Sequence, residues 1–214
     1  PISNSDELKI IKMSEFIFDV SIEEKNYLIK KNIPRKKILF THTPIEFKNK
    51  INFKQKKFDF IFSGSNWFQN TLNLKKIFEE KINFFTDKNI LIMGTKKVSL
   101  PTKYNKIKFK KFDKKLYSYS KIGLAPIRHK NGRNVKIFEM LSYGLPVFTN
   151  VNLTKYGLKD EKHYFLVKNN KWEEKLRHYY YKDDFLKLVG MNARSWSKKN
   201  SNHLHVFKKI LNRI

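Results

Sequence analysis

The sequence is poor in several residue types, and each shortage limits what the protein can be. It has no cysteine, 2 alanines, 7 glycines and 6 prolines in 214 residues. Without cysteine, disulfides and cysteine-ligated metal sites are excluded, which fits a cytoplasmic protein. No run of about 18 apolar residues occurs, so we expect no membrane-spanning helix. Residues 1–4 contain no initiator methionine and no targeting pattern. We therefore expect an internal start, that is, a fragment of a longer protein.

The net charge of +27 has three candidate explanations. The 46 basic residues are 40 lysines and 6 arginines, accompanied by 21 asparagines, 21 isoleucines and 19 phenylalanines, which is typical of an AT-rich genome. A nucleic-acid-binding protein would use more arginine, whose planar guanidinium group bonds phosphates and base edges bidentately. An anionic membrane surface would attract exposed lysines. Because the lysines are spread over the whole chain, genome composition is favoured, membrane contact comes second and nucleic acid third.

Short apolar runs alternate with amphipathic stretches of helix length along the chain. The predicted strands cover 16–20, 38–42, 58–62, 90–93, 107–109, 122–125, 146–149 and 164–167. The predicted helices cover 70–80, 116–119, 133–143 and most of 171–214, with breaks near 182–183 and 200–201. Another helix follows Ser21, where Ser21 and Glu24 have the spacing of a capping box. This alternation predicts an α/β fold with a Rossmann-like, doubly wound parallel sheet, preceded by a lysine- and asparagine-rich linker at 48–57.

The segment 125–147 has the pattern of an anion-binding site. A strand ends at Pro126, a loop with Gly132 follows, and a helix begins near Arg133. In a parallel sheet, the free N–H groups and the positive dipole end of such a helix lie at the carboxyl edge of the strands. This arrangement suits a diphosphate.

Within this helix, polar and apolar residues occupy different faces. Gly132, Lys136, Glu139 and Tyr143 fall on one stripe, while the apolar side chains of 137, 138 and 141 fall on the opposite side and should face the core. A nucleotide laid along the stripe would meet Lys136 at its phosphates and Glu139 at its ribose hydroxyls. The simpler alternative is that Lys136 and Glu139 form an exposed i, i+3 ion pair.

The run over 132–147, Gly-x-x-x-Lys-Ile-Phe-Glu-x-Leu-x-x-Gly-x-Pro-Val, resembles the donor-site motif of group 1 glycosyltransferases of the GT-B type. Residues 58–80, 119–126, 164–167 and the helices after 171 resemble the family's C-terminal, nucleotide-sugar-binding domain. Residues 14–47 resemble the last strand–helix–strand unit of its N-terminal domain. The resemblance implies that 1–51 is the end of the acceptor-side domain with a linker, 52–200 the donor-binding domain, and 201–214 a C-terminal helix.

The same resemblance implies a function and a set of residues. It implies a metal-independent transferase that moves a sugar from a nucleoside-diphosphate sugar to an acceptor hydroxyl, in polysaccharide, lipopolysaccharide or glycolipid assembly. Such an enzyme would be cytoplasmic, with peripheral contact at the inner membrane face, and it would need no cofactor. Lys136 and Glu139 would be the catalytic residues. The donor-binding residues would be Gly64, Ser65, Arg128, Asn131, Gly132, Arg133, Asn134, Lys136 and Glu139.

Two departures from the family pattern keep other functions open. Asn131 stands where the family's commonest form has its first Glu, and Ser65 follows Gly64 where the family usually has an arginine. A non-catalytic module with a degenerate GT-B fold is therefore an alternative, and a basic nucleic-acid-binding domain is a second one. The sequence also lacks the Asp-x-Asp metal motif of the other main glycosyltransferase class.

Overall fold

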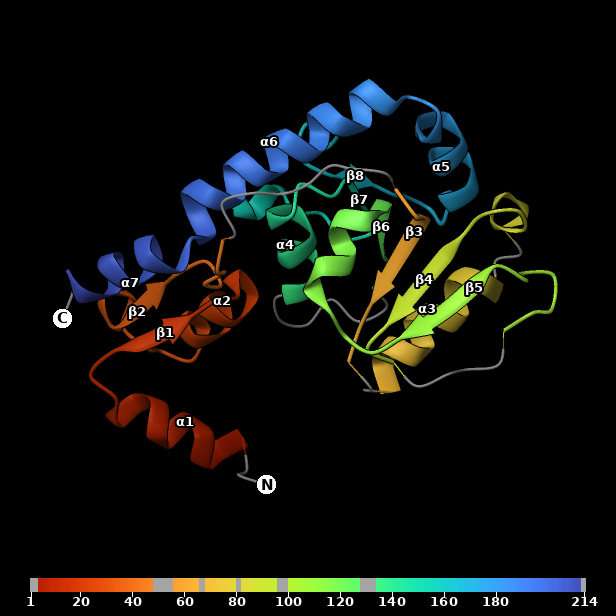
Figure 1. The fold of residues 1–214 in the computed structure, drawn as a ribbon. Coiled ribbons are helices and arrows are strands. Elements are labelled where there is room, and N and C mark those ends of the chain that lie inside the picture. The colour runs from red at the N-terminus through yellow and green to blue at the C-terminus, as the bar shows by residue number, and fades with distance from the viewer. Residues whose placement is uncertain are drawn as a thin grey trace.

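The computed structural model describes residues 4–47, 56–65, 68–79, 82–95, 100–127 and 134–212, which contain two parallel sheets (Figure 1). The smaller sheet pairs β1 (Ile17–Asp19) with β2 (Ile38–Phe40). Around it lie α1 (Asn4–Met13), α2 (Ile22–Lys30) and the 3-10 turn η1 (Arg35–Lys37). The strands predicted at 16–20 and 38–42 are thus confirmed, although each is shorter than expected.

The larger sheet has six parallel strands in the order β5-β4-β3-β6-β7-β8. Counted along the chain, this is the 3-2-1-4-5-6 order of a doubly wound, Rossmann-like sheet, and the predicted fold class is confirmed. Every predicted strand of this sheet is present to within two residues at each end. The strands are β3 (Phe58–Ser63), β4 (Ile90–Met93), β5 (Ile107–Lys110), β6 (Ser120–Ala125), β7 (Val147–Thr149) and β8 (Phe165–Leu166).

Helices and 3-10 turns connect these strands and extend beyond the last one. They are α3 (Phe68–Glu79), η2 (Asn83–Phe85), η3 (Lys114–Tyr119), α4 (Val135–Ser142), η4 (Thr154–Tyr156), α5 (Trp172–Tyr180), α6 (Asp183–Ser201) and α7 (His203–Leu211). The chain leaves α4 through Gly144, whose φ of 66° is a left-handed conformation that glycine adopts without strain. The predicted helix breaks near 182 and 201 are confirmed.

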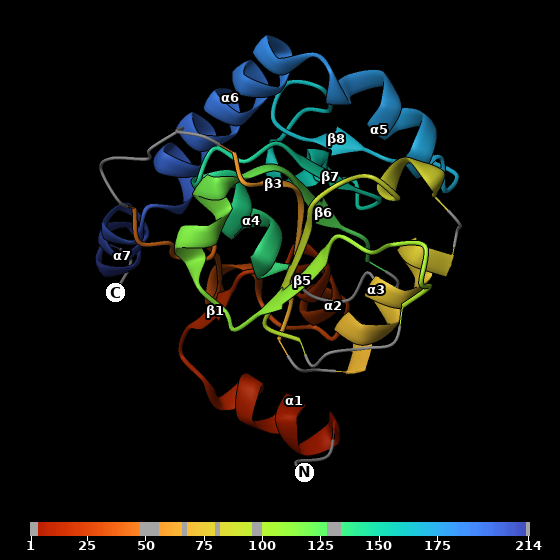
Figure 2. The same cartoon turned by 45° about the vertical axis from the view of Figure 1, so that its right-hand side comes forward.

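Each face of the six-stranded sheet packs against its own set of helices (Figures 1 and 2). On one face, Phe60, Ile92 and Phe148 contact side chains of α3, η2 and α5. On the other face, Ile61 and Val147 contact η3, α4 and the second half of α6. Because both faces are covered, β3 and β4 are apolar almost throughout, as expected for buried parallel strands.

The small sheet packs on the α4 side of the large one. Phe40 stacks at 6.4 Å from Tyr156, and His42 meets Trp196 edge to face at 5.1 Å between ring centroids. The side chains of Lys155 and Tyr156 both bond Glu23 of α2. These contacts fix the small sheet on the large one, while the predicted division into 1–51, 52–200 and 201–214 stays a prediction.

The capping box predicted before α2 is only half correct. Ser21 Oγ accepts a hydrogen bond from the Glu24 amide at 3.3 Å, as expected. The return bond from Glu24 to the Ser21 amide is wrong, because Asp19 Oδ1 accepts that N–H at 2.7 Å. A buried carboxylate two residues upstream therefore takes the place of the expected glutamate.

None of the helices in the described ranges is both long and apolar enough to cross a membrane.

Candidate functional site

The strand order places a switch point between β3 and β6. From β3 the chain moves outward to β4 and β5, and from β6 it moves to β7 and β8 on the other side. Ligands of open α/β sheets bind outside the carboxyl ends of the strands at such a point. Here those ends lead into residues 64–65 after β3 and into residues 126–127 after β6, and the amino ends of α3 and α4 follow.

The turn after β3 is held by Asn70 from the first turns of α3. The Asn70 amide nitrogen donates to the carbonyl oxygen of Ser65 at 3.0 Å and to its hydroxyl at 3.1 Å. Asn70 lies so close to the turn that a Cβ on Gly64 would come within 2.8 Å of its Cγ. Glycine is therefore required at 64 by the close approach of a buried side chain, and Asn70 has one fixed orientation.

Lys136, in the first turn of α4, donates a hydrogen bond to the Asn70 side chain held in this orientation. Its Nζ donates to Asn70 Oδ1 at 2.7 Å and lies 5.0 Å from the centroid of the Phe62 ring. Burial lowers the pKa of Lys136 from 10.5 to about 8. Across the described ranges no carboxylate forms an ion pair with this lysine, whose contacts there are an amide oxygen and an aromatic face.

Glu139, one turn further along α4, makes a different contact. Its carboxylate forms an ion pair with Lys114 of η3 at 2.8 Å, and its side chain is 16% exposed. The hydrogen bond to Glu139 raises the pKa of Lys114 above its ordinary value. The simpler alternative from the sequence, an exposed ion pair between Lys136 and Glu139, is therefore wrong, because the two side chains have different partners.

Two tyrosines pack against each other near Glu139. The Tyr117 hydroxyl donates to Ser63 Oγ at 2.9 Å, and its ring meets the ring of Tyr143 at 5.4 Å. Burial raises the pKa of both hydroxyls. Both tyrosines therefore stay neutral at physiological pH and can donate hydrogen bonds, but they add no charge to the site.

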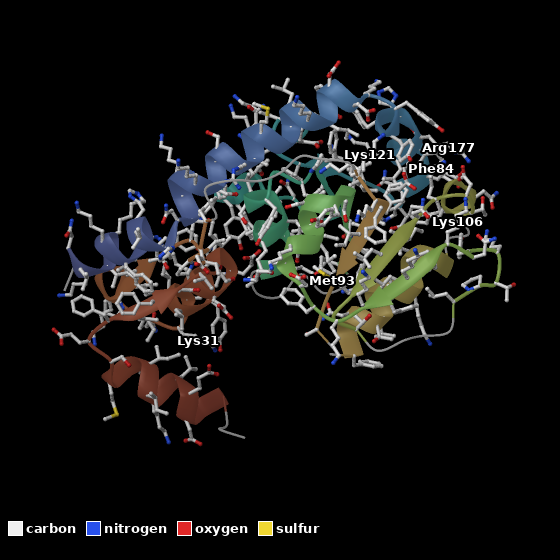
Figure 3. All side chains as sticks on the ribbon, in the orientation of Figure 1. Lys31, Phe84, Met93, Lys106, Lys121 and Arg177 are labelled. Atoms are coloured by element: carbon white, nitrogen blue, oxygen red, sulfur yellow. The ribbon has the colours of Figure 1, made fainter. Side chains whose placement is uncertain are left out.

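Cations at the opposite edge of the sheet have partners of a different kind. Lys121 at the start of β6 pairs with Asp183 at 2.7 Å and lies 4.1 Å from the Tyr180 ring centroid. Arg177 lies over Phe84 and pairs with Glu173 at 2.6 Å. In Figure 3, Lys121, Phe84 and Arg177 gather at this edge, away from Met93 at the carboxyl end of β4. Unlike Lys121 and Arg177, Lys136 has no carboxylate partner among the residues that the structure describes.

The sequence-predicted site residues fall into two groups. Five of them, Gly64, Ser65, Asn134, Lys136 and Glu139, lie on the turn after β3 or on the start of α4, at the same edge of the sheet. The structure joins Ser65 to Lys136 through Asn70, whereas Glu139 faces η3 instead. The other four, Arg128, Asn131, Gly132 and Arg133, lie outside the described residues.

Two residues that matter here, Lys114 and Asn70, cannot be assigned a role from the sequence alone. Lys114 was missed, because it is 25 positions from Glu139 in an ordinary lysine-rich stretch. Asn70 is the first residue of the helix predicted at 70–80, and its type alone does not assign it to the site. Its one available signal is its position shortly after the Gly64 turn, where a polar side chain can bond the free groups of the turn.

No family model matches the chain, and no curated protein matches it in sequence. Solved structures do match. TarM from S. aureus superposes with a TM-score of 0.76 at 13% identity, covering 98% of this chain and 46% of TarM. Anabaena HepE in complex with UDP and glucose gives 0.75 at 9% identity, covering 98% of this chain and 67% of HepE. A glycosyltransferase from Rickettsia africae gives 0.74 at 16% identity, covering 99% and 66%.

The chain has the fold of a GT-B glycosyltransferase domain. At these identities the likeness concerns the fold alone. This GT-B domain spans about half of the TarM chain, with 46% of it covered. The predicted resemblance is confirmed at the level of the fold.

Proposed function

We propose that this GT-B domain binds a nucleoside-diphosphate sugar and that the protein transfers the sugar to an acceptor hydroxyl. The observation that carries the proposal is Lys136, a partly buried cation without a carboxylate partner in the described ranges, at the start of α4 and at the switch point of the sheet. A buried charge is costly unless it is paired. A diphosphate bound at this position would form an ion pair with Lys136. The free N–H groups at the start of α4 would stabilise the second negative charge of the diphosphate.

Glu139 supports the nucleoside part of the proposal. Lys114 Nζ bonds Oε1 of this carboxylate, and none of the described residues hydrogen-bonds Oε2. Two neighbouring hydroxyls of a ribose could donate to such a carboxylate. The distance along α4 from residue 136 to residue 139 is about 4.5 Å, at 1.5 Å per residue, which suits a ribose next to its phosphates.

In the reaction, the domain would act mainly by electrostatic stabilisation. As the sugar leaves, negative charge develops on the diphosphate, and Lys136 together with the helix N–H groups would stabilise that charge. Arg128 and Arg133 would contribute further positive charge. A general base for the acceptor would come from a domain that binds the acceptor.

We further propose that the reaction needs no metal ion. The described residues contain no group of three or more His, Cys, Asp or Glu side chains that could hold one. A positive helix end and Lys136 would supply the charge that a metal supplies elsewhere. Activity unchanged in EDTA is the expected result, and loss of activity that added Mg²⁺ or Mn²⁺ restores would contradict this part. The acceptor would belong to polysaccharide, lipopolysaccharide or glycolipid assembly, on the cytoplasmic side of a membrane.

Calorimetric titration with UDP tests donor binding. UDP is the first ligand to use, because it is present in the solved structures of HepE and of pneumococcal GtfA; GDP and inorganic pyrophosphate are the comparison ligands. We expect wild type to bind UDP, Lys136→Met to lose affinity for UDP and pyrophosphate alike, and Glu139→Ala to lose affinity for UDP only. Lys115→Met, at an exposed neighbour of the site, is the matched control. Absence of binding to any nucleoside diphosphate would refute the proposal.

A non-catalytic GT-B module is the second candidate. Ser65 favours it, because the backbone and hydroxyl oxygens of this residue are both bonded to Asn70 and it offers no cation to a phosphate. Such a module would bind UDP without turnover. Hydrolysis or transfer from a UDP-sugar, measured as UDP release and abolished in Lys136→Met, would exclude it.

A further inference from the structure

The small sheet borders a cavity that the donor site does not use. This cavity is lined by residues of α1, β1 and α2 between Glu7 and Leu28, and its volume is about 780 Å³. Small-molecule sites have volumes of about 300–1,000 Å³, so the size suits a small ligand. In Figures 1 and 2, α1 lies at the periphery of the molecule, away from the six-stranded sheet. We call this space the α1 cavity.

The walls of the α1 cavity carry negative charge, although the chain as a whole is strongly basic. Four of the 19 acidic residues of the sequence line it, and these are Glu7, Asp19, Glu23 and Glu24. Its described lining contains no lysine, arginine or histidine. Glu23 pairs with Lys155 of η4, whereas no ion pair to the other three carboxylates occurs within the described ranges. A chain with 40 lysines therefore leaves three carboxylates of one cavity without a basic partner.

Asp19 provides a second, independent observation. Its side chain lies at the end of β1 and is 5% exposed. Its Oδ1 atom accepts the Ser21 amide, but its Oδ2 atom is buried and has no donor among the described residues. A buried carboxylate oxygen without a donor is costly, and in a native structure it indicates a bound donor or ion.

The carboxylates of the α1 cavity also affect one another. Partial burial raises the pKa of Glu24, and the negative charge of Asp19, a hydrogen bond with Asp19 and the charge of Glu7 raise it further. Glu24 therefore keeps its proton more readily than a free glutamate does. A positively charged group among these three side chains would remove their repulsion and give Asp19 the donor that it lacks.

The rest of the lining is apolar and aromatic. It includes Leu8 and Ile11 of α1 and Tyr27 and Leu28 of α2. Lys31 lies over the Tyr27 ring, with its Nζ 5.6 Å from the centroid, which shows that this ring accepts a cation. Carboxylates that alternate with apolar side chains match a ligand whose ammonium groups are joined by methylene groups.

We propose that the α1 cavity binds a small organic polycation, in which two or more ammonium groups are joined by aliphatic carbons. One ammonium group would bind between Asp19 and Glu24, whose exposed side chain can turn to admit it, and another would bind Glu7. A metal ion is a poorer match, since the described residues contain no group of three or more His, Cys, Asp or Glu side chains that could hold one. The net charge of +27 does not oppose the proposal, because charges beyond about 8 Å are largely screened at physiological ionic strength. The proposal goes beyond the proposed sugar transfer and does not depend on it.

Calorimetric titration of the full chain with spermidine, at physiological ionic strength, tests the proposal. We expect wild type to bind spermidine at a single site. Asp19→Asn keeps the oxygen that accepts the Ser21 amide, and it should lower the affinity at least about tenfold, as should Glu24→Gln. Glu15→Gln is the matched control, because it removes the same charge from an exposed position outside the lining, and it should bind as wild type does.

Proton release distinguishes ligand binding from a structural role of the carboxylates. Because an ammonium group stabilises ionised Glu24, spermidine should lower the pKa of Glu24 and release protons at a pH near that pKa. The affinity should fall as the pH falls through the same range. The release is measured as the dependence of the binding enthalpy on the ionisation enthalpy of the buffer, and Glu24→Gln should abolish it. Unchanged thermal melts verify that the variants are folded.

Several outcomes would overturn the proposal. These are failure of wild type to bind spermidine, unchanged affinity in both Asp19→Asn and Glu24→Gln, and displacement of spermidine by an equal concentration of Mg²⁺. Tighter binding of an oligolysine peptide than of spermidine would assign the α1 cavity to a protein partner. A wild-type dimer in light scattering that Asp19→Asn dissociates would assign it to a second copy of the chain.

Discussion

Replacing Lys136 by methionine is expected to make the ligand-free protein more stable and to remove its affinity for diphosphates. The reason is that the folded protein partly buries this ammonium group without a carboxylate partner in the described ranges. Methionine keeps the apolar stem and contributes no charge. A residue that lowers stability in the absence of ligand is expected at a binding site and would be unexpected in a purely structural role.

The expected change in stability is the difference between two contributions of Lys136. Burial lowers the pKa of Lys136 from 10.5 to about 8, which corresponds to roughly 3 kcal/mol at neutral pH. The substitution also leaves the Asn70 Oδ1 atom without its donor, at a cost of about 1–2 kcal/mol. The net expectation is a gain of about 1–2 kcal/mol, or a melting temperature higher by roughly 2–6 °C for a chain of this size.

The stability gain from Lys136→Met must decrease as the pH rises. Because the pKa of Lys136 is lower in the folded than in the unfolded state, the unfolded protein binds more protons between about pH 8 and pH 10.5. The stability contribution of Lys136 in wild type therefore rises with pH across this window. The advantage of Lys136→Met should be complete below about pH 8 and should disappear toward pH 10.5.

The assay is thermal and urea unfolding of wild type and Lys136→Met at pH 7 and pH 10, each with and without UDP. UDP should raise the melting temperature of wild type and leave that of the variant unchanged. Lys115→Met controls for the loss of an exposed lysine. A variant that is less stable than wild type at pH 7 without ligand would refute the reasoning, because the buried ammonium group would then be stabilising.

Three further predictions concern the same site. The affinity of wild type for UDP should be constant below about pH 8 and fall as pH rises through that value, because the diphosphate pairs with protonated Lys136. A calorimetric series from pH 6 to pH 9.5 that shows no such fall would contradict this prediction. Lys114→Met should weaken UDP binding by about tenfold and leave pyrophosphate binding unchanged, because Lys114 orients Glu139. Lys114→Arg should bind UDP as wild type does. Tighter UDP binding in Lys114→Met would mean that Lys114 competes with the ligand. Gly64→Ala should destabilise the protein by about 1–3 kcal/mol and weaken pyrophosphate binding, because its Cβ would displace Asn70; urea unfolding with an unchanged midpoint would disprove the close approach.

The sequence determined the local structure of this chain because local structure depends on neighbouring residues. The apolar runs of β3 and β4 and the glycine after α4 fixed where elements begin and end. The period of α4 placed Ile137, Phe138 and Leu141 in the core, where the structure has them 0–1% exposed. The same period placed Lys136 and Glu139 away from the core. The alternation of strands and helices along the chain was enough to predict the fold class, whereas the edge of the sheet that carries the site stays a prediction.

Partners distant in sequence were decided only by the tertiary structure. Lys136 meets Asn70 across 66 residues, and Glu139 meets Lys114 across 25. The alternation of strands and helices is compatible with several strand orders, and only the order found brings α3, α4 and η3 to one edge. Backbone propensity and helical period act over a few residues, whereas the pairing of charges and the covering of apolar faces depend on which elements the sheet makes neighbours.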